Sequence, residues 1–364
     1  MKLILHPGHG KCGSSTLQEF LKKNLDKFED LGIGIVNQNL ELGKLRKQDW
    51  APPTFMIQDI LAGRIEPEIV KIKFEKLKDE TRKRRFKAII LSCIHLLHTK
   101  RINGEILIHD EIKRTFEEVL VIYYIRRQDD FLLSAWQQWG IKRGLTFPEY
   151  IEESKLIQRP SYLKSIKDFQ SIYGKEALKL GLINRQILYK GDLLTDFIHR
   201  IGLENDPFEK VSDVNISINL SYSDILRRIS GYFKDQSDNH LKNLLQRNST
   251  NAKHILFSNR KPSFFYNYSL QIMQFYEDIN REIHEEFFNQ YDFEELFGKN
   301  IYDFKTGDQR LPDEMEELKE VIAIQNDLIF SLISKHANLA NRMNSHSRKK
   351  IKSRVRRFLK GYLD

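Results

Sequence analysis

Residues 3–21 read LILHPGHGKCGSSTLQEFL, and this stretch decides the fold of the chain. It begins with an apolar run typical of a buried strand, passes through a glycine-rich bend that contains Lys11, and ends in a helical pattern that opens on Ser14, Ser15 and Thr16. Backbone N–H groups at the start of a helix have no partner inside the helix and attract anions. The stretch therefore predicts a strand, a phosphate-binding loop and a helix.

The order of residues in this loop differs from that of ATP- and GTP-binding P-loops. In those loops Lys is followed at once by Ser or Thr, whose hydroxyl binds Mg²⁺. Here Lys11 is followed by Cys12 and Gly13, and the apolar run at 119–125 ends in Arg126 and Arg127 rather than in a metal-binding Asp. We therefore expect protein cations alone to neutralise the bound phosphate, with no metal site and no metal requirement.

Further apolar runs rich in β-branched residues are typical of strands in a parallel sheet that helices cover on both faces. The runs lie at 2–6, 33–36, 88–93 and 119–125, with a fifth at 178–183 or 186–189. Helical patterns separate them at 15–29, 66–86, 128–142 and 162–173. This alternation predicts a P-loop-like, doubly wound α/β fold with about five parallel strands.

The rest of the chain predicts a helical C-terminal extension. Periodicity is helical from about residue 222, so we expect one α/β domain over 1–300, a linker at 301–312, and a region at 313–364 that holds an amphipathic helix (313–340) and a basic tail. We expect one of two roles for this region. The helix at 313–340 serves self-association, or the helix and the tail together bind an acidic partner or a glycan.

Positive charge is concentrated at the C-terminus. The last 20 residues hold eight Lys or Arg and one acidic residue, which is +7 of the total formal charge of +9. The nearly neutral remainder argues against a nucleic-acid partner. The apolar residues of 346–364 recur at helical spacing among the cations, which predicts either peripheral contact with an anionic membrane or a solvated tail.

Compartment is predicted from what the sequence does not contain. No run of 18 apolar residues occurs, the N-terminus lacks the pattern of a signal peptide, and only two cysteines, Cys12 and Cys93, are present. These features predict a cytoplasmic protein, at most peripheral to a membrane, with both thiols reduced.

Two segments in order give a resemblance to a known family. GKCGSSTLQEFL (10–21) is similar to the first signature of the sulfotransferases that use 3′-phosphoadenosine 5′-phosphosulfate, and YYIRRQDDFLLSAW (123–136) is similar to the second, an Arg with a Ser eight residues later. YKGDLLTDFIHRIGL (189–203) and INREIHEEFFNQYDFEELF (279–297) resemble segments of bacterial, carbohydrate-type members. The resemblance covers roughly residues 1–300.

The resemblance implies transfer of a sulfuryl group to a hydroxyl or amine of a carbohydrate or glycolipid acceptor. It implies that Lys11 binds the bridging oxygen and the 5′-phosphate, and that residues 12–16 (Cys12, Gly13, Ser14, Ser15 and Thr16) cradle the donor. Arg126 and Ser134 would hold the 3′-phosphate, with Arg127 as the competitor of Arg126.

The general base is expected close to the carboxyl end of the run at 88–93. His95 is our choice, because it follows this run closely. Bacterial relatives carry Glu one place earlier, where this chain has Ile94, so His98 and His9 stay open as competitors. Two alternatives stay open: a P-loop kinase or NTPase, and a non-catalytic nucleotide-binding scaffold that keeps the donor site but lacks a base.

Overall fold

The computed structural model describes residues 1–42, 47–98, 107–211, 218–249, 251–257, 261, 263–298 and 315–336. The chain divides into two compact units, each built from separate stretches of sequence. Unit 1 is drawn from 1–135, 147–215 and 266–303, and unit 2 from 136–146, 216–265 and 304–364. The predicted linker at 301–312 and the basic tail at 346–364 lie outside the described residues.

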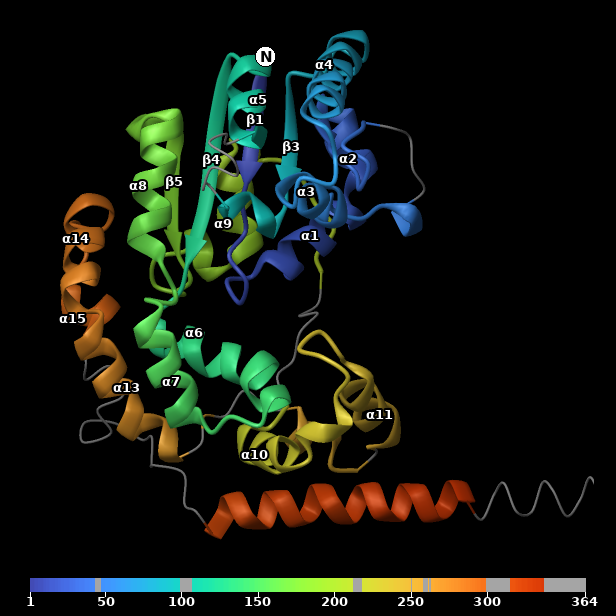
Figure 1. Cartoon of the computed structure of the whole chain (residues 1–364), viewed down its shortest axis with the longest axis vertical. Coiled ribbons are helices and arrows are strands. Elements are labelled where there is room, and N and C mark those ends of the chain that lie inside the picture. Colours follow the sequence, from blue (N-terminus) through green and yellow to red (C-terminus); the bar gives the residue numbers. More distant parts are fainter. Residues whose placement is uncertain are drawn as a thin grey trace, which may run out of the picture. The chain divides into compact units, whose positions relative to one another are not determined.

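Unit 1 contains a five-stranded, all-parallel sheet (Figure 1). Its strands are β1 (Lys2–His6), β2 (Ile33–Ile35), β3 (Ala88–Ser92), β4 (Glu118–Ile125) and β5 (Leu178–Leu182), in the order β2-β3-β1-β4-β5. The predicted strands are confirmed, and 178–183 was the correct choice for the fifth. The alternative at 186–189 was wrong, since Tyr189–Gly191 forms a 3₁₀ turn instead.

The sheet forms because its strands are apolar along nearly their whole length and are covered on both faces. Every residue of β3 is buried, and so is β4 from Val121 onward. Register places His6, the last residue of β1, beside Ser92, the last residue of β3. β4 extends four residues beyond the point where Leu5 pairs with Val121, so its end flanks the loop that leaves β1.

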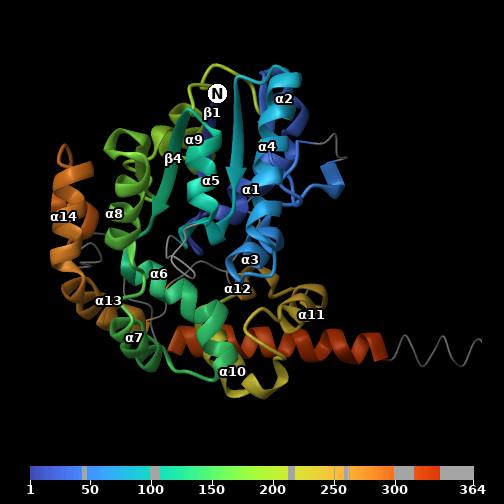
Figure 2. The ribbon, with the colours of Figure 1, turned by 45° about the horizontal axis from the view of Figure 1, so that its top comes forward.

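Helices cover the sheet on both faces, as a doubly wound fold requires. They are α1 (Ser14–Lys23) and α2 (Leu25–Asp30) between β1 and β2, α3 (Thr54–Leu61) and α4 (Pro67–Lys83) between β2 and β3, α5 (Leu107–Thr115) between β3 and β4, α6 (Gln128–Ala135), α7 (Phe147–Leu156) and α8 (Tyr162–Tyr173) between β4 and β5, and α9 (Leu193–Arg200) after β5. Right-handed crossovers in opposite directions put α1 and α2 on one face and α4 and α5 on the other. Contacts between α1 and α9, and between α4 and α5, agree with this, and Figure 2 shows α4 and α5 beside the strands.

Two predicted helices differ from the observed ones. The pattern at 15–29 is divided at Asn24, whose buried amide donates to the carbonyls of Phe20 and Glu209 and accepts from the N–H of Glu209. The pattern at 128–142 ends as an α-helix at Ala135 and continues as a π-helical turn (Trp136–Gly140) and a 3₁₀ turn (Ile141–Arg143). In both places contacts with distant residues outweigh local periodicity.

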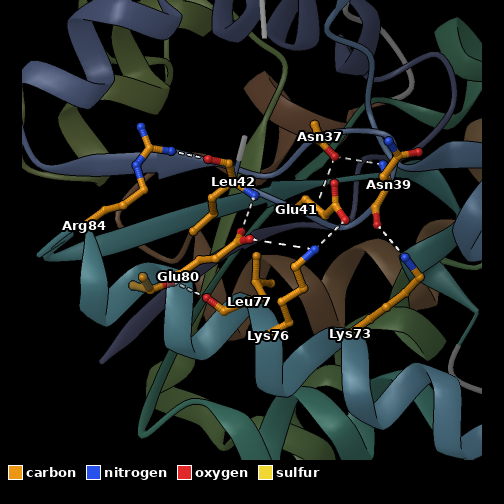
Figure 3. Close-up of polar contacts among 10 residues, drawn as sticks. Asn37, Asn39, Glu41, Leu42, Lys73, Lys76, Leu77, Glu80 and Arg84 are labelled. Atoms are coloured by element: carbon orange, nitrogen blue, oxygen red, sulfur yellow. Dashed lines mark hydrogen bonds and ion pairs between the residues drawn. The ribbon is translucent and has the colours of Figure 1, made fainter. Parts of the chain in front are cut away.

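The loop that follows β2 is fixed against α4 (Figure 3). Asn37 Oδ1 accepts from the N–H groups of Asn39 and Glu41, and Lys76 on α4 pairs with Glu41 at 3.0 Å. Glu80, one turn further along α4, accepts from the N–H of Leu42 at 3.1 Å. These contacts keep this loop at the side of the sheet that carries β2.

Unit 2 is helical in its described part, and unit 1 is completed by helices late in the chain. Unit 2 contains α10 (Leu220–Arg228), α11 (His240–Asn248), α12 (Lys253–Leu256), the turn Ser230–Tyr232 and a helix at 315–336. α13 (Ser263–Phe275) begins in unit 2 and continues in unit 1, where α14 (Glu277–Phe287) and α15 (Phe293–Phe297) follow. The helix predicted at 313–340 is thus observed over 315–336. Of the helices in the described ranges, none has both the length and the apolar composition needed to cross a lipid bilayer.

Candidate functional site

The candidate site lies where the chain leaves β1 and β4. From β1 the connection runs toward the β2 edge, and from β4 it runs toward the β5 edge. Open α/β sheets bind ligands at the carboxyl ends of strands where the direction of winding reverses in this way. The loop at 7–13 leaves β1 at this point, beside Arg126 at the end of β4.

The backbone of this loop is left-handed at three positions. Gly8, Lys11 and Gly13 have φ of 54°, 67° and 76°, in the left-handed region, and Cys12 N–H donates to His9 O at 3.0 Å. Alternation of left- and right-handed residues forms the concave N–H arrangement that binds anions. A left-handed lysine costs of order 1–3 kcal/mol, and such strain is concentrated at ligand sites.

Gly13 cannot be replaced without moving its surroundings. Its φ of 76° disfavours other residues, and a Cβ at this position would lie 2.3 Å from Leu193 Cδ2, at the start of α9. The glycine predicted from the sequence therefore has a double physical reason, the turn and the close approach of α9.

The N-terminus of α1 completes the anion site. The helix begins at Ser14, and the N–H of Leu17 donates to Gly13 O at 3.0 Å, so the N–H groups of Ser14, Ser15 and Thr16 have no carbonyl partner inside the helix. The first turn carries no acidic side chain that would compete with an anion. Ser14 is buried, with its hydroxyl 3.5 Å from His9 O, whereas Ser15 is exposed and Thr16 partly exposed.

Cys12 joins the loop to the end of β4. Its buried thiol lies 3.6 Å from Tyr162 Oη, and Tyr162 Oη accepts the N–H of Arg126 at 3.3 Å. Burial raises the pKa of Cys12 to about 12, while the nearby charges of Arg126 and Lys11 act in the opposite direction. Through Cys12 and Tyr162 the backbone segment of Lys11 is thus joined to that of Arg126.

Arg126 and Arg127 have different environments, and this bears on the choice between them. The Arg127 guanidinium is 6% exposed, forms a two-pronged ion pair with Asp129, and donates to the carbonyls of Leu296 and Gly298. Arg126 is about one third exposed and lies 3.7 Å from Asp130. Arg127 is therefore committed to holding α15 onto the fold, and Arg126 is the arginine that a ligand can reach.

Ser134 is carried by the last turn of α6, about two helical turns beyond Arg126. It is partly buried. Its place in the last turn follows from the start of α6 at Gln128.

The segment that contains His95 borders the loop. His6 Nδ1 lies 2.8 Å from Ser92 Oγ, Cys93 N–H donates to His6 O, and a Cβ on Gly8 would meet Ile94 Cγ2 at 3.4 Å. His95 follows in the 3₁₀ turn Ile94–Leu97, partly exposed. Burial lowers its pKa, and the neighbouring His98, stacked at 6.0 Å between ring centroids, lowers it further.

The two competing histidines differ from His95 in their surroundings. His9 lies within the loop, with its ring against Phe131 and Tyr162 at 5.1 Å and its Nδ1 3.0 Å from Gly10 O, and burial lowers its pKa to about 4. His98 is exposed. His95 thus combines partial exposure with an imidazole that is neutral at pH 7.

Sequence reasoning missed Tyr162, Ser92 and Gln18. Tyr162 bridges Cys12 and Arg126, and Ser92 Oγ is shared by His6 and by Gln18 Nε2, which lies 3.4 Å away. A tyrosine on the apolar face of a helix carries no sequence signal for such a role. Cys12 and Cys93 are both free and buried.

Comparison with known proteins identified no relative of this chain. No family model, no curated protein and no solved structure matches it. The function must therefore be argued from the site itself.

Proposed function

We propose that this chain is a sulfotransferase that moves a sulfuryl group from 3′-phosphoadenosine 5′-phosphosulfate to a hydroxyl or amine of a carbohydrate or glycolipid acceptor. The observation that supports the proposal is a link between two backbone segments beside the N-terminus of α1. Cys12, next to Lys11, contacts Tyr162 Oη, and the same oxygen accepts the N–H of Arg126. A donor with a 5′-phosphosulfate and a separate 3′-phosphate needs two cationic positions, and this arrangement offers them.

The residues present fit such a donor. Lys11 and the N–H groups of Ser14, Ser15 and Thr16 suit the 5′-phosphate, because a lysine acts as a point charge and helix N–H groups add directed hydrogen bonds. Arg126 suits the 3′-phosphate, because its planar fork donates two parallel hydrogen bonds to a terminal phosphate, and Ser134 adds a hydroxyl. When bound, the donor supplies the activated sulfuryl group.

Within the chain, Lys11 stabilises the negative charge that develops on the departing 5′-phosphate. His95 accepts the proton of the acceptor hydroxyl, since a base must be unprotonated to act and its lowered pKa keeps the imidazole neutral at pH 7. Its partly exposed position beside Ile94 leaves the imidazole accessible to an acceptor.

Calorimetric titration tests the donor site most directly. We expect binding of 3′-phosphoadenosine 5′-phosphate that needs no metal and exceeds the binding of ATP with Mg²⁺. Preferential binding of ATP with Mg²⁺ would overturn the proposal in favour of a kinase or NTPase. Donor binding without sulfuryl transfer to any carbohydrate acceptor would instead leave a non-catalytic nucleotide-binding protein.

A pair of matched variants tests the role of Lys11. Lys11→Ala should lower sulfuryl transfer by at least ~10²-fold, since removal of one preorganised donor to developing charge typically has this effect. Lys22→Ala, which removes the same charge from the last turn of α1, should leave the rate unchanged. Equal effects of both substitutions would mean that only the general charge of the surface matters.

A further inference from the structure

The helix at 315–336 has one face packed within unit 2. Val321 and Ile324 are buried, and the Asp327 carboxylate accepts from Ser249 Oγ at 3.0 Å and from the N–H groups of Asn251 and Ala252 at 3.0 and 3.2 Å. Asn219, which caps α10, donates to Glu320, and Lys335 donates to Asn248 at the end of α11. Figure 1 shows this helix, in red, beside α10 and α11, and these contacts fix its rotation.

A second apolar face of the same helix is exposed. Its line is formed by Met315, Leu318, Ile322, Ile329 and Leu332, whose side chains are between 46% and 56% exposed. We call these five residues, with Gln325 between them, the 315–332 stripe. At 100° per residue the stripe is centred roughly 130° from Ile324, the fully buried centre of the packed face. Ile333 and Phe330, 58% and 68% exposed, lie along one side of the stripe.

The spacing of the stripe is that of a coiled-coil seam. Its members recur at intervals of three and four residues, so Met315, Ile322 and Ile329 occupy a positions of a heptad and Leu318, Gln325 and Leu332 occupy d positions. Together with Ile333 at a neighbouring e position, this a/d repeat forms a seam that fits another helix. A helix that lies on a membrane instead carries a wide apolar face opposite a basic one.

Charge along the helix indicates its partner and its direction. The first two turns carry Glu316, Glu317 and Glu320 against one cation, Lys319, whereas the last turn ends in Lys335 and His336. Antiparallel pairing of two such helices brings the acidic end of each beside the basic end of the other and also opposes the helix dipoles. Parallel pairing would bring like charges together.

We propose that the 315–332 stripe pairs in antiparallel fashion with the same stripe of a second copy of this chain. In the register of fullest overlap, Met315 of one copy lies opposite Leu332 of the other, and the single polar seam residue, Gln325, lies near the centre. One polar residue in an otherwise apolar seam fixes register at a cost in affinity.

Sedimentation equilibrium of the full chain tests the proposal. The wild-type chain should be a dimer, Ile322→Lys/Ile329→Lys should raise the dimer dissociation constant by at least ~10²-fold, and Gln325→Leu should lower it. The matched control is Phe330→Lys/Ser334→Lys, which places two lysines at exposed positions of the same helix off the stripe and should remain dimeric. A monomeric wild-type chain, a dimer that survives Ile322→Lys/Ile329→Lys, or a weaker dimer with Gln325→Leu would each overturn it.

Disulfide cross-linking tests the direction of pairing. A mixture of Met315→Cys chains and Leu332→Cys chains should give the mixed dimer on mild oxidation, while Met315→Cys chains alone should not cross-link, and the native cysteines are buried. Cross-linking of Met315→Cys chains with one another would overturn the antiparallel arrangement.

Discussion

At the residue scale, the environments of Arg126 and Arg127 at the end of β4 distinguish the arginine that a ligand can reach from the one that is buried. Arg127 and Asp129 form a buried ion pair, and Ser269 Oγ donates to the same carboxylate at 2.6 Å. Arg126 lies 3.7 Å from Asp130 and stays partly exposed. The eight-residue spacing to Ser134 predicts Arg126 as the ligand-binding residue, and burial of Arg127 supports that choice.

Substitution of each arginine should therefore give opposite phenotypes. Arg126→Ala should raise the Kd for 3′-phosphoadenosine 5′-phosphate by roughly 10- to 100-fold with stability unchanged, because a charge-assisted hydrogen bond contributes about 1.5–3 kcal/mol. Arg127→Ala should lower the free energy of unfolding by about 3–5 kcal/mol, because Asp129 would remain buried without its partner. Calorimetric titration and urea unfolding measure the two effects. Loss of binding by a stable Arg127→Ala protein would reverse the assignment.

His95 has a testable pH dependence. A general base acts in its neutral form, so the rate should fall as pH falls through the pKa of His95, and burial places that pKa below the ordinary value of 6.5. His95→Asn should reduce turnover by roughly 10²–10⁴-fold, leave donor binding unchanged, and abolish this acidic limb of the pH–rate profile. The same substitutions at His98 and His9 are the comparison. An unchanged profile in His95→Asn would transfer the role to one of them.

The residues of the candidate site differ in how their positions are encoded. The positions of Lys11, Gly13 and Arg126 could be predicted because strand, loop and helix follow one another locally, and each residue occupies a fixed offset in that series. Tyr162 could not, since its contacts with Cys12 and Arg126 depend on where α8 packs, more than 30 residues away in sequence from either partner. The spacing of residues in the sequence predicts local geometry, whereas contacts between distant residues become known only from the folded structure.

At the element scale, the strands were predictable and the helix ends were not. β1, β3 and β4 are apolar along most of their length because the sheet is buried on both faces, and this leaves a strong signal in the sequence. The helix pattern at 128–142 continued beyond Ala135, but there the side chains turn to unit 2: Trp136 Nε1 donates to Leu145 O at 2.7 Å and Gln137 donates to Ser223. These partners, and not the local periodicity, set the π-helical turn.

Asp327 binds the helix at 315–336 to residues 249–252 through its carboxylate. Asp327→Ala would leave the hydroxyl of Ser249 and two N–H groups, of Asn251 and Ala252, without their carboxylate, and each buried donor left unsatisfied costs about 1–3 kcal/mol. Amide hydrogen exchange should therefore increase at both 249–257 and 315–336. Asn326→Ala, at the exposed neighbouring position, should change neither segment. Faster exchange in 315–336 alone would mean that Asp327 stabilises only its own helix.

At the scale of the whole molecule, the two units are interleaved in sequence, which composition and periodicity do not reveal. Residues 136–146 leave unit 1 between α6 and α7 to join unit 2, and 266–303 return to unit 1 after the α10–α12 segment. Such an arrangement depends on contacts between distant residues, such as Arg227 with Gly144 O and Gln128 with Asn280. The predicted division at residue 300 instead followed a change in local composition.

The stability of unit 1 should fall on mild acidification, because several of its histidines are held neutral. Burial lowers the pKa of His6, His9 and His109 to about 4, against 6.5 for a solvated imidazole. Above pH 6.5 both folded and unfolded forms are neutral. Between pH 6.5 and 4 only the unfolded chain binds these protons, so stability declines by about 1.4 kcal/mol per pH unit for each histidine, and below pH 4 the decline levels off.

Urea unfolding between pH 7.5 and 5 measures that decline. His6→Asn/His109→Asn keeps an amide where each Nδ1 makes its hydrogen bond, to Ser92 and Tyr173 respectively, but removes both titrating groups. Its stability at pH 7.5 can differ from the wild type in either direction. Its slope with pH should be smaller by about 2.7 kcal/mol per unit below pH 6, since two proton-binding sites are lost from the unfolded chain. Equal slopes in the two proteins would mean that these imidazoles are protonated in the folded state as readily as in the unfolded one.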